Sequence, residues 1–175
     1  MSSDDKLNVL FEILSNEQLT LQRTDQKAFT LLSIIGVFAV FFIIHYTKIP
    51  PDIFNLSLIF LYFVSVSVSI FFLLLVIVPR LTGSKSRTAK DLYVTPTYFG
   101  GIVKYKSPKE YSDELKKILD NADSSHDAFV HSIYSIGIIN ASKNKYFKKG
   151  IIFFVIAIAL ELIIIVALYA RLALS

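Results

Sequence analysis

The chain contains no cysteine among its 175 residues. This absence excludes disulfide bonds, thiolate catalysis and every metal site that uses cysteine ligands. Enzyme motifs are also missing, because the sequence has no glycine-rich phosphate loop, nucleophile elbow or kinase signature. The N-terminus MSSDDKLNVLFEIL lacks the basic region and short apolar core of a cleaved signal peptide. We therefore expect no enzymatic activity, no metal and no other cofactor, and we expect the first apolar run to stay in the mature protein.

Charged residues are almost absent from three long stretches, 28–46, 53–78 and 151–170. Each stretch reaches or exceeds the roughly 18 to 20 residues that a helix needs to cross about 30 Å of hydrocarbon. The whole chain is 54% hydrophobic, with a mean hydropathy of +0.57. A closed barrel needs many more alternating segments than these three continuous runs supply. The sequence predicts an all-α membrane protein with transmembrane helices at 28–46, 53–78 and 150–171.

Two of these helices are predicted to extend beyond the membrane. Residues 1–27 form an amphipathic helix that no proline or glycine separates from the first span, with one apolar face made of Leu7, Leu10, Phe11, Leu14 and Leu21. A second long helix is predicted to begin at about residue 125, with Ser124 as its N-cap, and to run into the third span. Its expected contact face comprises Phe129, Ile133, Ile136 and Ile139 or Asn140, and Gly150 is expected to loosen it.

The region between spans two and three, residues 79–149, is predicted to be small and mostly helical. After a loop, Ser107, Pro108 and Glu110 have the arrangement of an N-cap, a first helical position and a capping-box carboxylate. The helix that they start is predicted to cover 108–121 and to pack through Tyr111, Leu115, Ile118 and Leu119.

The distribution of lysine and arginine predicts the orientation in the membrane. The segment from Arg80 to Lys149 holds thirteen of the eighteen basic residues, whereas the turn after span one has only Lys48 and the C-terminal tail only Arg171. Cytoplasmic segments carry the excess of positive charge, so we expect the N-terminus and 79–149 in the cytoplasm and the C-terminus outside. Lys143, Lys145, Lys148 and Lys149 are expected to anchor the third span at the lipid headgroups.

The stretch VSVSVSI at residues 64–70 alternates like a strand, but an open strand in lipid would leave its backbone groups unpaired, so we predict helix. On a helix Ser65 and Ser69 share a face and Ser67 points away.

Glu161 lies within the third apolar run, where a carboxylate is costly and usually functional. Counted from Arg80 and Lys149, Ser69 and Glu161 lie at similar depth, which predicts a contact between them. In the alternative, each serine bonds a carbonyl of its own helix, and Glu161 is protonated and packed between helices.

A candidate ligand site lies between spans two and three. Guanidinium and ammonium groups suit phosphate, and aromatic rings suit a nucleobase. The candidate residues are Arg80, Arg87, Tyr98, Phe99 and Lys104.

Short motifs follow one another from about Leu7 to Ala170: Asp25-Gln26-Lys27-Ala28 before Leu31-Leu32 and Gly36, Pro79-Arg80, Tyr98-Phe99-Gly100, Ser107-Pro108-Lys109-Glu110-Tyr111, and Lys145-Tyr146. In this order and spacing they resemble the transmembrane effector family of bacterial Pycsar antiphage systems. Related SLATT-type membrane domains share the layout. Asp25 and Lys27 match the family motif where the first span meets the membrane, and the match implies a structural role for them.

The resemblance implies a partner pyrimidine cyclase that makes cyclic UMP or cyclic CMP during infection. The effector would sense this nucleotide through its cytoplasmic region and impair the inner membrane, which causes abortive infection. We expect the lipid bilayer, the cyclic nucleotide and further copies of the chain in a homo-oligomer as partners, and no nucleic acid.

Three alternatives stay open. The chain could be a passive scaffold that anchors a soluble partner through its basic face, or a SLATT-type pore-forming effector that answers another signal. A membrane-embedded enzyme would need Glu161 together with a histidine, but His45, His126 and His131 are all predicted to lie far from Glu161 in depth.

Overall fold

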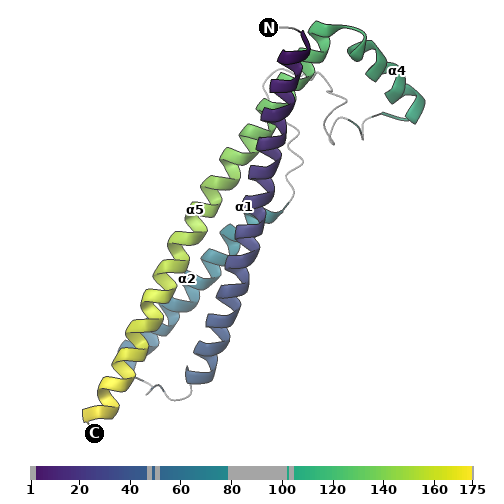
Figure 1. Cartoon of the computed structure of the whole chain (residues 1–175). Coiled ribbons are helices and arrows are strands. Elements are labelled where there is room, and N and C mark those ends of the chain that lie inside the picture. The colour runs from purple at the N-terminus through teal and green to yellow at the C-terminus, as the bar shows by residue number, and fades with distance from the viewer. Residues whose placement is uncertain (1–2, 47–48, 50–51, 79–101, 103–104, 175) are drawn as a thin grey trace. The chain divides into compact units, whose positions relative to one another are not determined.

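The computed structural model describes residues 3–46, 49, 52–78, 102 and 105–174. This part of the chain is helical throughout its regular structure and contains no strand, so the predicted all-α class is confirmed. The helices, shown in Figure 1, are α1 (Ser3–Tyr46), α2 (Ile53–Ile77), α4 (Pro108–Leu119) and α5 (Ala122–Leu174).

Three of the described helices are long and apolar enough to cross a membrane, and the apolar segments that qualify are Leu7–His45, Ile53–Ile77 and Ser124–Ala170. The stretch VSVSVSI lies inside α2. It is therefore helical despite its alternating pattern, as the lack of backbone partners in lipid requires. Both α1, with 44 residues, and α5, with 53, are continuous helices, as the absence of proline within them predicts.

The start of α4 follows the predicted capping box. The Ser107 hydroxyl accepts a hydrogen bond from the Glu110 amide at 3.2 Å, and Pro108 occupies the first turn. The Glu110 carboxylate accepts from the amide of Lys106, at 3.0 Å, rather than from that of Ser107.

The predicted cap of α5 is wrong by three residues. The helix begins at Ala122, so Ser124 lies inside its first turn. Asn121 is the capping residue instead, because its side-chain oxygen accepts from the Ser124 amide at 3.3 Å. Asparagine caps as well as serine does, and the residue nearer to the end of α4 takes the position.

The chain divides into two compact units. The first comprises Met1–Gln22 and Pro79–Ala141, and the second comprises Arg23–Val78 and Ser142–Ser175. In the first unit the predicted contact face of α1 holds for Leu7, Leu10, Leu14 and Leu21, which are half-buried. It is wrong for Phe11, which is 64% exposed, and the predicted face of α4 is wrong for Leu119, which is 63% exposed.

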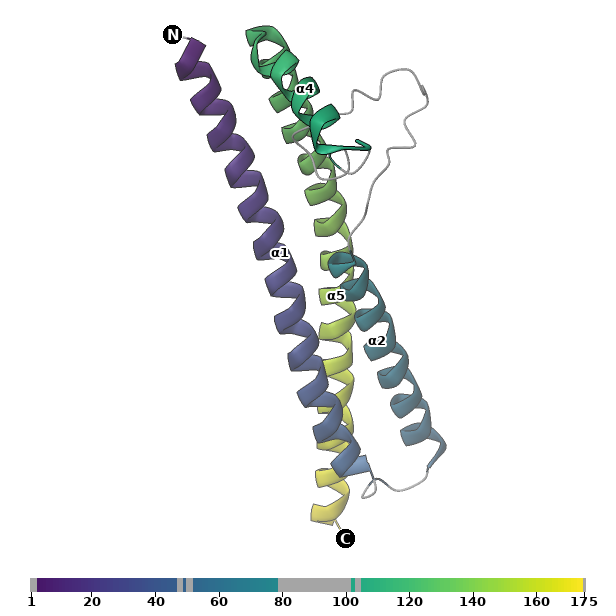
Figure 2. The ribbon, with the colours of Figure 1, turned by 90° about the vertical axis from the view of Figure 1, so that its right-hand side faces the viewer.

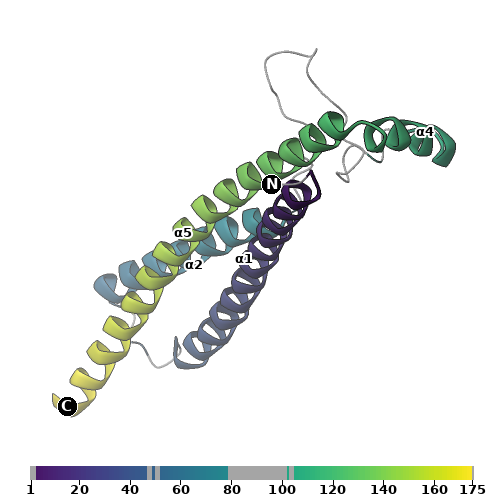
Figure 3. The same cartoon turned by 45° about the horizontal axis from the view of Figure 1, so that its top comes forward.

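The second unit contains two hydrophobic core clusters. One cluster is centred on Phe42 of α1, Tyr62 of α2 and Leu160 of α5, and another on Ala28, Ile35, Leu73 and Val76. Figures 2 and 3 show α2 alongside the C-terminal part of α5 in two views. Each of the three helices therefore buries one stripe of residues and exposes the rest of its apolar surface.

Gly150 permits a close approach of α2 to α5. The Ser69 hydroxyl donates to the Gly150 carbonyl at 2.8 Å, and a Cβ added to Gly150 would lie 2.9 Å from the Leu73 side chain. The expectation that Gly150 loosens the helix is wrong, because α5 passes through it without a break. A small residue is needed there because the neighbouring helix occupies the space.

Replacing Gly150 with alanine should lower the free energy of unfolding by about 1–3 kcal/mol, because Leu73 is fully buried and must be displaced. Gly36 is the matched control, since a Cβ there meets nothing within 4 Å. Its change to alanine should be neutral or stabilising by up to about 1 kcal/mol. Thermal unfolding in detergent measures both, and equal effects would contradict the assigned role of Gly150.

Candidate functional site

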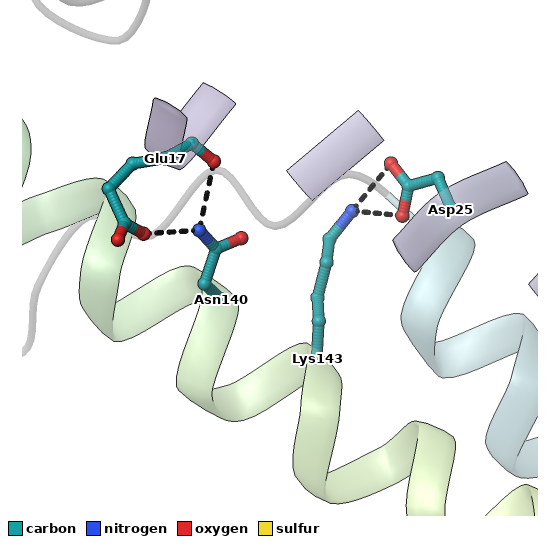
Figure 4. Close-up of polar contacts among 4 residues, drawn as sticks. All are labelled: Glu17, Asp25, Asn140 and Lys143. Atoms are coloured by element: carbon teal, nitrogen blue, oxygen red, sulfur yellow. Dashed lines mark hydrogen bonds and ion pairs between the residues drawn. The ribbon is translucent and has the colours of Figure 1, made fainter. Parts of the chain in front are cut away.

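A buried ion pair joins α1 to α5 in the second unit. The Lys143 ammonium lies 2.6 and 2.9 Å from the two carboxylate oxygens of Asp25, and Lys143 is only 5% exposed (Figure 4). The carboxylate of the Asp25 motif is thus part of a contact between helices. The expectation that Lys143 anchors the chain at lipid headgroups is wrong for this lysine, because its charge is directed into the protein.

The other lysines of that run differ from Lys143. Lys145 and Lys148 are exposed, as an anchoring role requires. Lys149 is also exposed, and its ammonium lies 5.2 Å from the centre of the Phe72 ring, within the range of a cation–π contact. Lys27, the second charged residue of the motif, is exposed on α1 and lines an open groove with Arg23.

The predicted contact between Ser69 and Glu161 is wrong within one chain. Ser69 bonds the Gly150 carbonyl, and Gly150 is eleven residues, about 16 Å, from Glu161 along α5. The Ser65 hydroxyl donates to the Leu61 carbonyl of its own helix at 2.9 Å. Both serines are buried and Ser67 is exposed, so the predicted division into a pair and an outlier is confirmed.

The error came from the depth count. The count takes Lys149 as level with the end of α2, but its ammonium lies over Phe72, which is inside that helix. The backbone itself is displaced, because Gly150, the residue after Lys149, accepts the hydrogen bond of Ser69, which lies eight residues before the end of α2 at Ile77.

Glu161 lies instead near Tyr62, and the half-buried His45 at the end of α1 is the third polar side chain of this region. Glu161 is 2% exposed and Tyr62 is 1% exposed. Their side chains are close enough to interact electrostatically, as are Glu161 and His45, but neither carboxyl oxygen of Glu161 nor the Tyr62 hydroxyl makes a hydrogen bond of standard geometry. The expectation that the histidines lie far from Glu161 is wrong for His45.

The surroundings of these three side chains are apolar and aromatic. The Tyr62 ring stacks on Phe42 with 4.2 Å between centroids, and the His45 Nδ1 atom lies 2.9 Å from the Phe41 carbonyl. Sequence reasoning found Glu161 but missed Tyr62, although a phenol in an apolar run also needs a partner when it is buried. No group of three acidic or imidazole side chains among the described residues could hold a metal ion.

Asn140 provides the polar contact of the first unit. Its side-chain amide donates to the Glu17 carbonyl at 3.0 Å and to the Glu17 carboxylate at 2.6 Å (Figure 4). Asn140 is buried, and Ile136 is buried on the same face of α5, as the predicted contact face of that helix requires.

Near the start of α4, Tyr105 packs edge-on against Tyr111, with 5.4 Å between ring centroids. Burial raises the pKa of the Tyr105 phenol above its usual value, and the nearby Glu114 raises it further.

The candidate nucleotide residues fall outside the described part of the chain. They are Arg80, Arg87, Tyr98, Phe99 and Lys104.

Taken together, the long apolar helices and their buried polar contacts define an all-helical membrane protein. A family model described as the Pycsar effector protein domain matches residues 9–171. The chain therefore belongs to the Pycsar effector family, and the resemblance seen in its short motifs is confirmed. No curated protein and no solved structure matches it.

Proposed function

We propose that this protein senses cyclic UMP or cyclic CMP through a cytoplasmic region and then impairs the inner membrane, which stops the infected cell before the phage multiplies. The observation that carries the proposal is the match of the Pycsar effector domain over 9–171, since that family acts downstream of a cyclase-made cyclic nucleotide. The protein itself needs no catalytic activity or cofactor for this role. Its proposed partners are the bilayer, the nucleotide and further copies of itself.

The proposed mechanism uses the continuity of the two long helices. Both α1 and α5 contribute residues to each of the two units. A nucleotide that binds one packing of these helices more tightly than another shifts the population toward that packing. We propose that the favoured packing is the one that perturbs the bilayer.

The proposed orientation places the N-terminus and residues 79–149 in the cytoplasm and the C-terminus outside, on the basis of the lysine and arginine distribution. The nucleotide is then on the side where a cyclase makes it. The proposed contacts are the cationic and aromatic residues of this region, Arg80, Arg87, Tyr98, Phe99 and Lys104.

Dye release from liposomes tests the proposal. Purified protein in vesicles of bacterial lipid should release an entrapped dye when cyclic UMP or cyclic CMP is added, and cyclic AMP should give several-fold less release. Calorimetry on the detergent-solubilised protein should detect binding of the same nucleotide. If neither pyrimidine nucleotide binds or causes release, the proposal fails.

The same experiments, together with a toxicity test on overexpression, separate the two other functions. A passive scaffold predicts no nucleotide binding, no dye release and no toxicity on overexpression. A SLATT-type effector that answers another signal predicts toxicity on overexpression without affinity for either cyclic pyrimidine nucleotide.

A further inference from the structure

An open groove lies in the second unit, where α1 and α5 both change from polar to apolar sequence. Residues of both helices line it, among them Arg23, Lys27, Thr30 and Leu31 of α1 and Phe147 and Ile151 of α5. Arg23, Lys27 and Thr30 are exposed, whereas the three apolar residues are half-buried. The groove thus has a cationic end and an apolar end.

The cationic end has no internal counterion. Arg23 and Lys27 are four residues apart and share one face of α1, so their charges repel each other. Neither makes an ion pair with any residue that the structure describes, and the carboxylate between them in sequence, Asp25, is bound to Lys143 instead. The pair of cations is therefore available to an external anion.

The apolar end continues into an exposed apolar surface of α1. Leu31 and Phe147 pack against the core cluster that contains Ala28 and Leu73. Along α1, the face that carries Arg23 and Lys27 continues as Ile34 and Val37, which are large and exposed. A ligand at the cations can therefore extend an alkyl chain along this helix without leaving an apolar surface.

We propose that this groove binds an anionic phospholipid, with the headgroup phosphate at Arg23 and Lys27 and an acyl chain beside Leu31 and Ile151. A guanidinium can bind phosphate oxygens through two hydrogen bonds, and the ammonium adds a second charge. Basic pockets at the membrane boundary of transmembrane helices are suited to anionic headgroups. The site does not depend on the proposed nucleotide response, because it rests on residues of the membrane helices alone.

Lipid binding to the full-length protein in detergent tests this site. Native mass spectrometry would compare retention of dioleoyl phosphatidylglycerol with that of dioleoyl phosphatidylcholine. The wild type should prefer phosphatidylglycerol, and R23Q/K27Q should reduce its affinity for that lipid by about thirtyfold, which corresponds to about 2 kcal/mol. The conservative variant R23K/K27R, which retains both charges, should keep most of the preference.

A matched control removes two other cations close to the membrane boundary. Lys145 and Lys148 are exposed and do not line the groove, so K145Q/K148Q should change the preference by less than about threefold. Circular dichroism should show the same helix content in all variants. Equal losses in R23Q/K27Q and K145Q/K148Q would overturn the proposal in favour of a general surface charge.

Two further arms complete the test. Inorganic phosphate at millimolar concentration should not displace phosphatidylglycerol, because it lacks the acyl chain; displacement would overturn the assignment of a lipid and identify a free phosphate site. A wild-type protein with no preference between the two lipids would also overturn it. The two proposals can also fail separately. If dye release does not depend on the nucleotide added while the protein still prefers phosphatidylglycerol, the proposed function is contradicted and this lipid site is not.

Discussion

Replacing Asp25 with asparagine should lower the melting temperature of the detergent-solubilised protein by roughly 6–12 °C. The change leaves the ammonium of Lys143, which is 5% exposed, without its anionic partner in a buried position. Removing one member of a buried pair costs about 3–5 kcal/mol, and the lower end applies because the Asp25 side chain is 27% exposed. Thermal unfolding followed by circular dichroism measures the effect.

The double variant D25L/K143M is the informative partner of this experiment. It removes both charges, and its free energy of unfolding should lie within about 1–2 kcal/mol of that of the wild type. A buried ion pair often contributes little more to stability than apolar residues of similar size. A second control is E114Q, which breaks the Lys117–Glu114 pair at 3.1 Å on the surface of α4. Exposed pairs are worth at most about 1 kcal/mol, so E114Q should change the melting temperature by only a few degrees. If D25N and E114Q changed the melting temperature by similar amounts, the buried pair would contribute no more to stability than an exposed one.

The sequence predicted the helices better than the contacts between them. The three apolar runs and the lack of proline were sufficient to place α1, α2 and α5. Whether a segment can span lipid depends on one property, the length of its apolar helix. The cap of α4 was also readable, since Ser107, Pro108 and Glu110 act within one turn. Local chemistry fixes such features without reference to the rest of the fold.

Contacts between helices depend on relative axial position, which no local pattern encodes. The partner of Asp25 is 118 residues away, so no local pattern identifies it. Lys143 did carry a signal, because it continues the face of Ile136 and Asn140 at helical spacing, whereas Lys145 and Lys148 lie on other faces. The same uncertainty in axial position misplaced Glu161 opposite Ser69, when its neighbour is Tyr62. Gly150 carried a usable signal, because a lone glycine in an apolar helix often marks a close approach.

Replacing Glu161 with leucine should make the protein more stable and less active. The carboxyl group is 2% exposed and neither of its oxygens makes a hydrogen bond of standard geometry, so its removal should raise the free energy of unfolding by about 1–3 kcal/mol. This corresponds to a rise in melting temperature of roughly 2–12 °C. An ionisable group within a membrane-spanning helix is usually functional, so we expect dye release to fall several-fold in the same variant.

Two variants separate the carboxyl group from the packing around it. E161Q keeps a buried polar group, so it should gain no stability, yet it should lose as much dye release as E161L because the ionisable group is gone. Y62F removes the other unpartnered group while keeping the ring that stacks on Phe42, so it should be neutral or slightly stabilising. If E161L unfolds more easily than the wild type, the carboxyl group makes a stabilising contact, and the cost assigned to it is wrong. If E161L and E161Q both release dye at the wild-type rate, Glu161 has no part in the activity and the cluster with Tyr62 and His45 serves packing alone.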